Sequence, residues 1–213
     1  EQMLPFLEDP SPRIRSAAVL GLIKHAGLDG ILHAGEHLKA LLDNPDPQGR
    51  LEGVRVLEAL QVPTFYHPLI PLLADVNIEV QIGTIRAATR IGTPELIPYL
   101  LPKLSHPLTR WYATDALNQC IGQDLPRLEE LLQNDRHLPE ARRQLIHLLA
   151  HHHSPQAVQL LVAQLHSDDD LLRSAAYQTL MKLRDAGLSI PGQPLRGVLH
   201  EELRSAYELH VVR

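Results

Sequence analysis

The sequence predicts an all-α fold in which about six helical hairpins stack into an α-α superhelix. Three observations predict it: a segment repeats along the chain, apolar residues recur at helical spacing, and the alternation typical of strands is nowhere sustained. Of the 213 residues, 44 % are hydrophobic and only 4 % aromatic. The core must therefore consist mainly of Leu, Ile, Val and Ala, which suits closely packed helices better than sheets.

The two copies of the repeat that match best are the first and the last. The segment IRSAAVLGL (Ile14–Leu22) matches LRSAAYQTL (Leu172–Leu180), and each follows a Leu-rich segment and an acidic or proline-containing turn. Successive turns are about 28 to 35 residues apart, a period typical of repeat architectures. Weaker copies have their turns at Asn44-Pro45-Asp46-Pro47, Asp75-Val76-Asn77, Ser105-His106-Pro107 and Asn134-Asp135.

Each unit is predicted to contain two helices. The first is short, and prolines inside it (Pro71, Pro98 and Pro102) are expected to bend it, because proline lacks an N–H and its ring clashes with the preceding turn. A polar N-cap, such as Ser11 before Pro12, then starts the second helix.

Small residues in the second helices mark places where helices are expected to approach closely: Ala17, Ala18 and Gly21 in the first unit, Ala87 and Ala88 in the third. Four glycines are expected just past helix ends, where a left-handed residue is common: Gly27, Gly92, Gly122 and Gly187.

One hairpin cannot bury its apolar face alone, so the hairpins are expected to stack on sequence neighbours. We assign residues 1–187 to this solenoid and residues 188–213 to a loop and a C-terminal capping or connecting helix. The chain begins at Glu1 and ends inside a helical pattern, at HVVR, so we expect it to be a piece of a longer protein.

The pattern L-x-x-L-L-x-D-x-[DN]-x-x-V-R-x-x-A-A-x-x-L resembles the HEAT repeat, in the short form also found in bilin-lyase-like proteins. The resemblance covers roughly residues 2–187. It is weakest in the fifth unit, where Pro139, Arg142 and Arg143 replace expected core residues. Proteins that pair a nucleotide-transporter-like membrane domain with HEAT repeats and a cyclic-nucleotide-binding domain contain stretches similar to this one.

Composition argues against several functional classes. The net charge is −5, so the overall basic excess of a nucleic-acid-binding protein is missing. Cys120 is the only cysteine, which rules out an intrachain disulfide and a cysteine zinc cluster and favours a reducing compartment. No apolar run is long enough to span a bilayer. We expect a cytoplasmic location, which includes the cytoplasmic part of a membrane protein.

Few side chains suggest chemistry. His33 with His37, and His147 with His151, have helical spacing for a metal site, but no Cys or Glu completes a motif. HEAT-like deoxyhypusine hydroxylases repeat a His-Glu pair in several hairpins, whereas here only His200-Glu201 occurs. Asp168, Asp169 and Asp170 are expected to cap a helix. Cys120 is expected to be a small buried side chain rather than a nucleophile. We therefore predict no catalytic residue, metal ligand or cofactor.

The second helices predict a binding groove. Counting from a core position at Ile14, the residues two, six and ten later should face the concave side. In the second and third units these include an apolar and basic set: Leu51, Arg55, Ile82, Arg86 and Arg90. Guanidinium groups beside aliphatic surface suit an acidic, partly apolar peptide, although ordinary solvated arginines are an alternative. Trp111, aligned with Ile14 and Val80, is expected in the core, with a binding role as the alternative.

We accordingly predict a non-catalytic protein-interaction scaffold or a spacer between domains. Its partner is a protein or the flanking domains of the same chain, with no nucleic acid and no membrane insertion. The alternative is a bilin-lyase-like enzyme subunit or chaperone, which the short repeats resemble. A HEAT-like DNA glycosylase is disfavoured by the acidic balance and by the lack of an aromatic-lined cleft.

Overall fold

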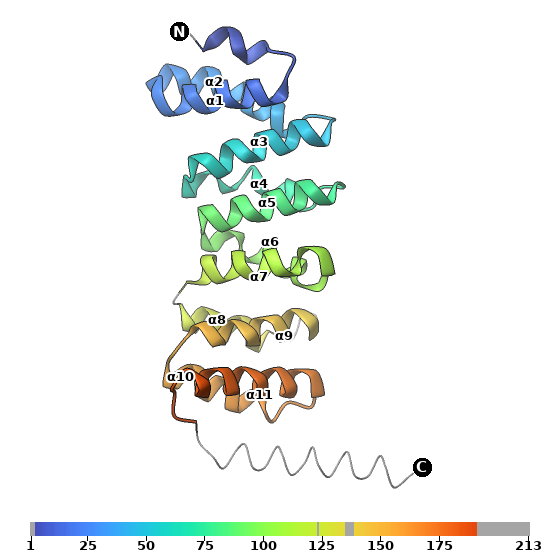
Figure 1. Cartoon of the computed structure of the whole chain (residues 1–213), viewed down its shortest axis with the longest axis vertical. Coiled ribbons are helices and arrows are strands. Elements are labelled where there is room, and N and C mark those ends of the chain that lie inside the picture. Colours follow the sequence, from blue (N-terminus) through green and yellow to red (C-terminus); the bar gives the residue numbers. More distant parts are fainter. Residues whose placement is uncertain (1–2, 123, 135–138, 191–213) are drawn as a thin grey trace, which may run out of the picture. The chain divides into compact units, whose positions relative to one another are not determined.

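The computed structural model describes residues 3–122, 124–134 and 139–190, and every regular element in these ranges is helical. Their contacts divide the chain into two units, residues 1–122 and 123–213. The predicted hairpins are present, four in the first unit and two in the second (Figure 1). The all-α prediction is confirmed. The helix predicted near the C-terminus lies outside the described residues.

The first unit pairs four second helices, α1, α3, α5 and α7, with first helices of very different form. Its elements are η1 (Leu4–Glu8), α1 (Pro12–His25), α2 (Gly27–Leu42), α3 (Pro47–Leu60), η2 (Pro63–Tyr66), α4 (Leu69–Leu72), α5 (Ile78–Ile91), η3 (Pro94–Leu96), α6 (Ile97–Leu100), η4 (Leu101–Ser105) and α7 (Pro107–Ile121).

Proline explains why the first helices differ. The α2 helix contains no proline and runs unbroken for 16 residues. In the next two hairpins, Pro71, Pro98 and Pro102 interrupt the ladder of backbone hydrogen bonds, and the first helix is divided into short α and 3-10 segments. The predicted bending of these helices is confirmed.

The second helices form the continuous part of the first unit. Helix α1 packs on α3, α3 on α5, and α5 on α7, as Figure 1 shows. Val80, Ala87 and Ala88 of α5 and Ala113 of α7 are fully buried at these contacts. Gly21 lies against the end of the Met3 side chain, whose Sδ would be 2.4 Å from a Cβ at that position.

Of two local predictions in the first hairpin, one holds in part and the other is wrong. Gly27 lies just past the end of α1, as predicted, but it is helical rather than left-handed, because only Ala26 separates α1 from α2 and Gly27 begins α2. Ala17 is exposed, whereas its neighbour Ala18 is buried. The other three glycines have positive φ, as expected: Gly92, Gly122 and Gly187.

The second unit holds two hairpins. Its elements are α8 (Leu125–Gln133), α9 (Pro139–Leu148), η5 (Leu149–His151), α10 (Pro155–Gln164) and α11 (Asp170–Asp185). Helix α9 packs on α11, and α10 packs on α11. The prediction that Arg142 and Arg143 stand at core positions is wrong, because both are half-buried while Ala141 and Leu145 fill the core.

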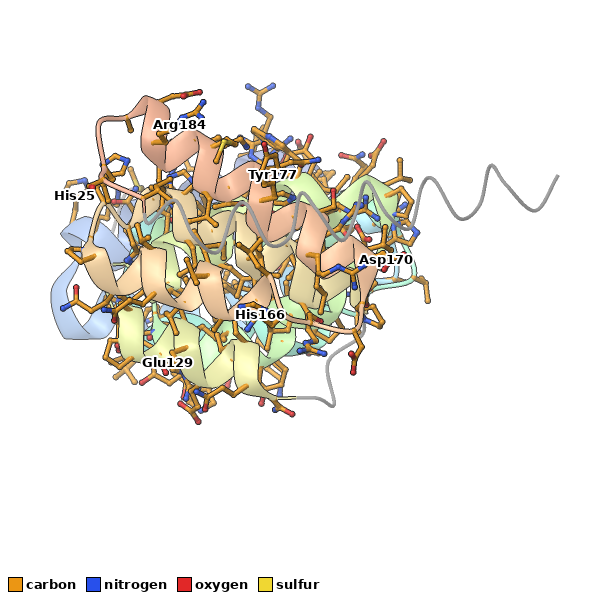
Figure 2. The ribbon with its side chains drawn as sticks, turned by 90° about the horizontal axis from the view of Figure 1, so that it is seen from below. His25, Glu129, His166, Asp170, Tyr177 and Arg184 are labelled. Atoms are coloured by element: carbon orange, nitrogen blue, oxygen red, sulfur yellow. The ribbon has the colours of Figure 1, made fainter. Side chains whose placement is uncertain are left out.

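Helix α11 has favourable charge at both ends. Asp169 caps it by accepting hydrogen bonds from the N–H groups of Leu171 and Leu172 at 2.8 and 3.4 Å. Figure 2 shows Asp170 at its beginning and Arg184 near its end, where each opposes the helix dipole. The predicted capping by this acidic run is confirmed.

Among the described residues, a recurring contact fixes the turn to the helix that follows it in five of the six hairpins. In four hairpins the first turn of the second helix carries an arginine that donates to the backbone carbonyl six residues earlier. The pairs are Arg15 to Asp9 at 2.7 Å, Arg50 to Asn44 at 2.8 Å, Arg110 to Leu104 at 3.0 Å and Arg173 to Ser167 at 2.9 Å. Gln81 donates to Asp75 in the same way, at 2.6 Å.

Arg50 also connects two successive turns. Its Nε and Nη2 donate to the two carboxylate oxygens of Asp75, at 2.7 and 2.8 Å. The two side chains are only 12 % and 7 % exposed. The Arg50 hydrogen bonds are the main reason that the pKa of Asp75 lies below its ordinary value.

We predict that Ala176→Asp strongly destabilises the second unit. Ala176 is fully buried, and an unpaired buried charge costs several kcal/mol or forces local unfolding. Asp169→Ala should cost about 1 kcal/mol through the lost cap. Denaturant titration followed by circular dichroism measures both. The control is Ala163→Asp, at an exposed position of α10, and equal midpoints for Ala163→Asp and Ala176→Asp would contradict this packing.

We also predict that Asp75 makes the stability of the first unit depend on pH. Its pKa is lower in the folded than in the unfolded chain, so the unfolded chain binds more protons near pH 4. The stabilisation is therefore present above about pH 4 and is lost as pH falls through the folded pKa. Asp75→Asn should lower the free energy of unfolding at neutral pH by about 3 kcal/mol and weaken this acid dependence. The exposed Asp115→Asn is the control, and parallel pH curves for wild type and Asp75→Asn would contradict the assignment.

Candidate functional site

The turn contacts define which positions of the second helices are equivalent. In α3, α5 and α7 the residue before this arginine or glutamine is buried, whereas in α1 that residue, Ile14, is exposed. The position that follows the arginine or glutamine can then be compared between helices. Ser16, Leu51, Ile82 and Trp111 are thus equivalent positions in the four hairpins of the first unit.

This register corrects the prediction for Trp111. Trp111 does not share a core position with Val80 but lies two positions further on, because Arg110 rather than a later residue contacts the turn. Its side chain is 72 % exposed, whereas Val80 is fully buried. The equivalent of Val80 in α7 is the fully buried Thr109, whose hydroxyl donates to the Lys103 carbonyl at 2.8 Å. Ile14, also expected in the core, is 43 % exposed.

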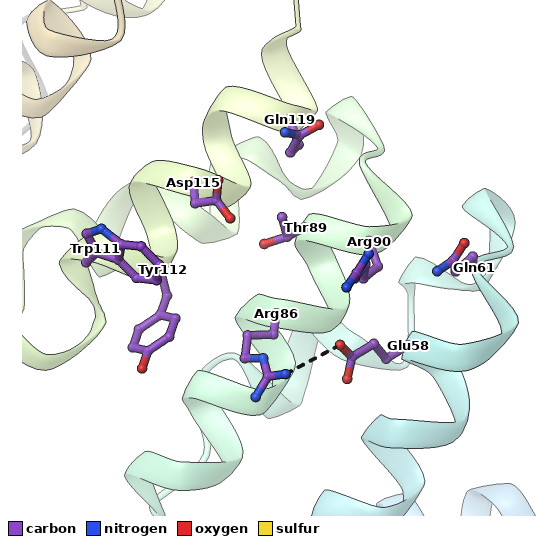
Figure 3. A pocket seen from close by; sticks show the side chains of 9 residues that line it. All are labelled: Glu58, Gln61, Arg86, Thr89, Arg90, Trp111, Tyr112, Asp115 and Gln119. Carbon is purple, nitrogen blue, oxygen red and sulfur yellow. Dashed lines mark ion pairs between the residues drawn. The ribbon is translucent and has the colours of Figure 1, made fainter.

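An open cleft of ≈ 510 Å³ lies across α3, α5 and α7. Figure 3 shows side chains from all three helices around it, together with the residue that follows α3. The cleft is lined by Glu58, Gln61, Arg86, Thr89, Arg90, Trp111, Tyr112, Asp115 and Gln119.

Charges of both signs line this cleft. Nη2 of Arg86 lies 3.9 Å from Oε1 of Glu58, and these side chains are 62 % and 25 % exposed. Arg90 is one turn beyond Arg86 and is exposed, as is Asp115 on α7. Within the described residues, no ion pair is formed by Arg90 or Asp115. A charged ligand can therefore pair with either group without breaking an existing ion pair.

Aromatic side chains form one end of the cleft. The rings of Trp111 and Tyr112 meet edge to face, with centroids 5.1 Å apart and planes at 83°. Trp111 precedes Asp115 by four residues, so both lie on the same face of α7 (Figure 3). Tryptophan, tyrosine and arginine, which all line this cleft, are residue types that protein interfaces favour.

Only two of the five residues predicted to form a binding groove line this cleft. Arg86 and Arg90 line the cleft, but Leu51, Arg55 and Ile82 do not. Leu51 is half-buried, and its Cδ1 would lie 2.6 Å from a Cβ added at Gly83, so it packs between α3 and α5. Ile82 is also half-buried.

Arg55 already has a partner. It forms an ion pair with Glu52, whose other carboxylate oxygen accepts a hydrogen bond from the Ser16 hydroxyl at 3.0 Å. Glu52 is only 7 % exposed, so this group links α1 to α3. From the sequence, a binding role for Trp111 was only the alternative, and Tyr112 and Asp115 were missed. The position of Arg110 at the start of α7 is the signal that could have identified all three.

The other candidate side chains have structural surroundings. Cys120 is 5 % exposed, and burial raises the pKa of its thiol to about 12, which opposes formation of a thiolate nucleophile. Nδ1 of His37 lies 3.8 Å from Glu8, and Nδ1 of His147 lies 3.1 Å from the Thr179 hydroxyl. In the described ranges, no three His, Cys, Asp or Glu side chains come together as a metal site would need. His200 and Glu201 lie outside these ranges.

Among the helices that the structure describes, none has the length and apolarity needed to cross a membrane.

The repeats of this chain are similar to those of known proteins. Residues 125–205 match the family model for HEAT repeats. No curated protein sequence matches the chain.

Three solved structures are among those similar to this chain. An engineered protein is 19 % identical, with a TM-score of 0.46 over 87 % of this chain and 96 % of that one. The complex of CpcE and CpcF of phycocyanin lyase from Nostoc sp. PCC7120 is 22 % identical, with a TM-score of 0.44 over 93 % of this chain and 79 % of that one. A designed armadillo repeat protein in complex with peptide (KR)4 is 18 % identical, with a TM-score of 0.42 over 85 % of this chain and 98 % of that one.

Proposed function

Because this chain carries HEAT repeats, we propose that it is a non-catalytic protein-interaction module that binds its partner in the cleft across α3, α5 and α7. The observation that supports this proposal is the 72 % exposure of Trp111 in a cleft that two arginines of α5 also line. The proposal moves the centre of the predicted groove from Leu51 and Arg55 to Arg86, Arg90 and Trp111.

The composition of the cleft supports a protein partner. Tryptophan, tyrosine and arginine dominate the binding energy of many interfaces, because they combine large apolar area with directional polar groups. Here these residue types come together around Trp111, Tyr112 and Arg90. Gln61, Thr89 and Gln119 add donors and acceptors for a partner's backbone.

The packing of the cleft's helices supports binding without large rearrangement. Each side chain is carried by a helix or helix end whose opposite face is buried, as in α5, where Val80, Ala87 and Ala88 are fully buried. Arg86 is oriented further by Glu58. Side chains on rigid elements lose less entropy on binding than those on loops.

Location in a reducing, cytoplasmic compartment is part of the proposal. Its support is Cys120, the single cysteine, which is buried as a thiol. A role as a spacer between domains is the alternative to partner binding, and the following experiment distinguishes them.

We predict that peptides selected on this chain depend on the cleft. Random peptides displayed on phage would be enriched on the immobilised wild-type chain, and the dissociation constants of the enriched peptides measured with each variant. Trp111→Ala, and the double change Arg86→Glu with Arg90→Glu, should each weaken binding by about 30-fold, the effect of losing a hot spot of about 2 kcal/mol.

Matched controls separate the cleft from the general surface. Leu108→Ala removes another exposed side chain of α7, at 59 % exposure, and Arg13→Glu reverses an exposed arginine of α1. Both should bind like the wild type, and circular dichroism checks that every variant is folded. Peptides that bind all variants alike would contradict the proposal and favour the spacer.

A further inference from the structure

We propose that the partner segment recognised by this cleft is extended and carries one acidic and one basic side chain about three residues apart. The acidic side chain pairs with Arg90 and Arg86 on α5, and the basic side chain lies between Asp115 and the Trp111 ring on α7. This inference rests on the proposed function and specifies the chemistry of its ligand.

The acidic side chain is assigned to α5 because both arginines of the cleft lie there. Arg86 and Arg90 are four residues apart and therefore adjacent on one helix face. Glu58 offsets part of the positive charge at Arg86, at 3.9 Å. Arg90 is exposed and takes part in no ion pair among the residues the structure describes, so it is the stronger site for a carboxylate.

The basic side chain is assigned to α7 because two kinds of cation-attracting group occur there. Asp115 is exposed and takes part in no ion pair within the described part of the chain. Trp111, one turn earlier, is 72 % exposed, and the face of an indole ring attracts an ammonium or guanidinium group. A lysine or arginine between them would interact with a carboxylate and an aromatic ring together.

The spacing follows from the packing of the two helices. Helices α5 and α7 are in contact, and the axes of packed helices are about 8–10 Å apart. An extended chain advances about 3.3 Å per residue, so three residues cover the distance from one helix to the next. In a peptide with two charges of the same sign at this spacing, one charge would lie next to a helix that carries the same sign: a second acidic side chain next to Asp115 of α7, or a second basic side chain next to Arg90 of α5.

Tryptophan emission provides a direct readout, because Trp111 is the only tryptophan in the chain. Three peptides of about ten residues in a Gly/Ser background would be titrated at low salt, with the pairs Glu-x-x-Lys, Glu-x-x-Glu and Lys-x-x-Lys. We expect the mixed-sign peptide to bind about fivefold tighter than either like-sign peptide, since each mismatched charge loses an exposed ion pair.

Reversing one charge tests the assignment of each helix. In Asp115→Lys, α7 presents a positive charge, so Glu-x-x-Glu should become the tightest of the three peptides. Asp115 is exposed, so the variant should fold. Glu36→Lys, at an exposed position of α2 outside the cleft, is the control that should keep the wild-type order.

The outcomes separate this inference from the proposed function. Equal affinities for the three peptides, no change of emission with any of them, or an unchanged order in Asp115→Lys would each overturn the inferred ligand. The phage-display experiment tests separately whether the cleft binds peptides at all. Its result depends on whether the Trp111 and Arg86/Arg90 variants lose binding, whatever charge pattern the selected peptides carry.

Discussion

The hydrogen bond from the start of a second helix to the preceding turn, made in five of the six hairpins among the residues that the structure describes, is the contact on which the other features depend. A turn between two helices leaves carbonyl groups without helical partners, and a buried carbonyl without a partner is costly. A long side chain six residues later supplies the missing donor and so fixes how the second helix is rotated about its axis. Arg15, Arg50, Gln81, Arg110 and Arg173 all do this.

Once that rotation is fixed, the two faces of each helix have separate roles. One face is buried against neighbouring helices, as Val80 and Thr109 are. The other face carries the side chains of the cleft, including Arg90 and Trp111. Contacts between hairpins then hold the faces side by side: Arg50 reaches Asp75 in the next turn, and Glu52 accepts from Ser16 on the preceding helix. The cleft therefore depends on the Arg50–Asp75 and Ser16–Glu52 contacts, although none of these four residues lines it.

Sequence periodicity predicted the hairpins, the buried Ala176, the Asp169 cap and the buried Cys120, because each follows from local spacing of apolar and polar residues. It placed Trp111 wrongly. The turn before α7 has no Asp or Asn, and an aromatic residue near a helix start suits a core position as well as a surface one. The arginine at the helix start, Arg110, distinguishes the two, because it contacts the turn. The cleft itself needs the separations between three helices, which no local pattern contains.

The central claim is that turn-bonded arginines set the register while other arginines remain available to a ligand. Hydrogen exchange of arginine Nε–H groups, measured by ¹H–¹⁵N NMR, tests it most directly. The Nε–H groups of Arg50 and Arg110 donate to Asp75 and to the Leu104 carbonyl, so they should exchange slowly. Those of the exposed Arg86 and Arg90 should exchange rapidly. Similar exchange rates for all four would contradict the account, because the arginines would then not differ in how they are held.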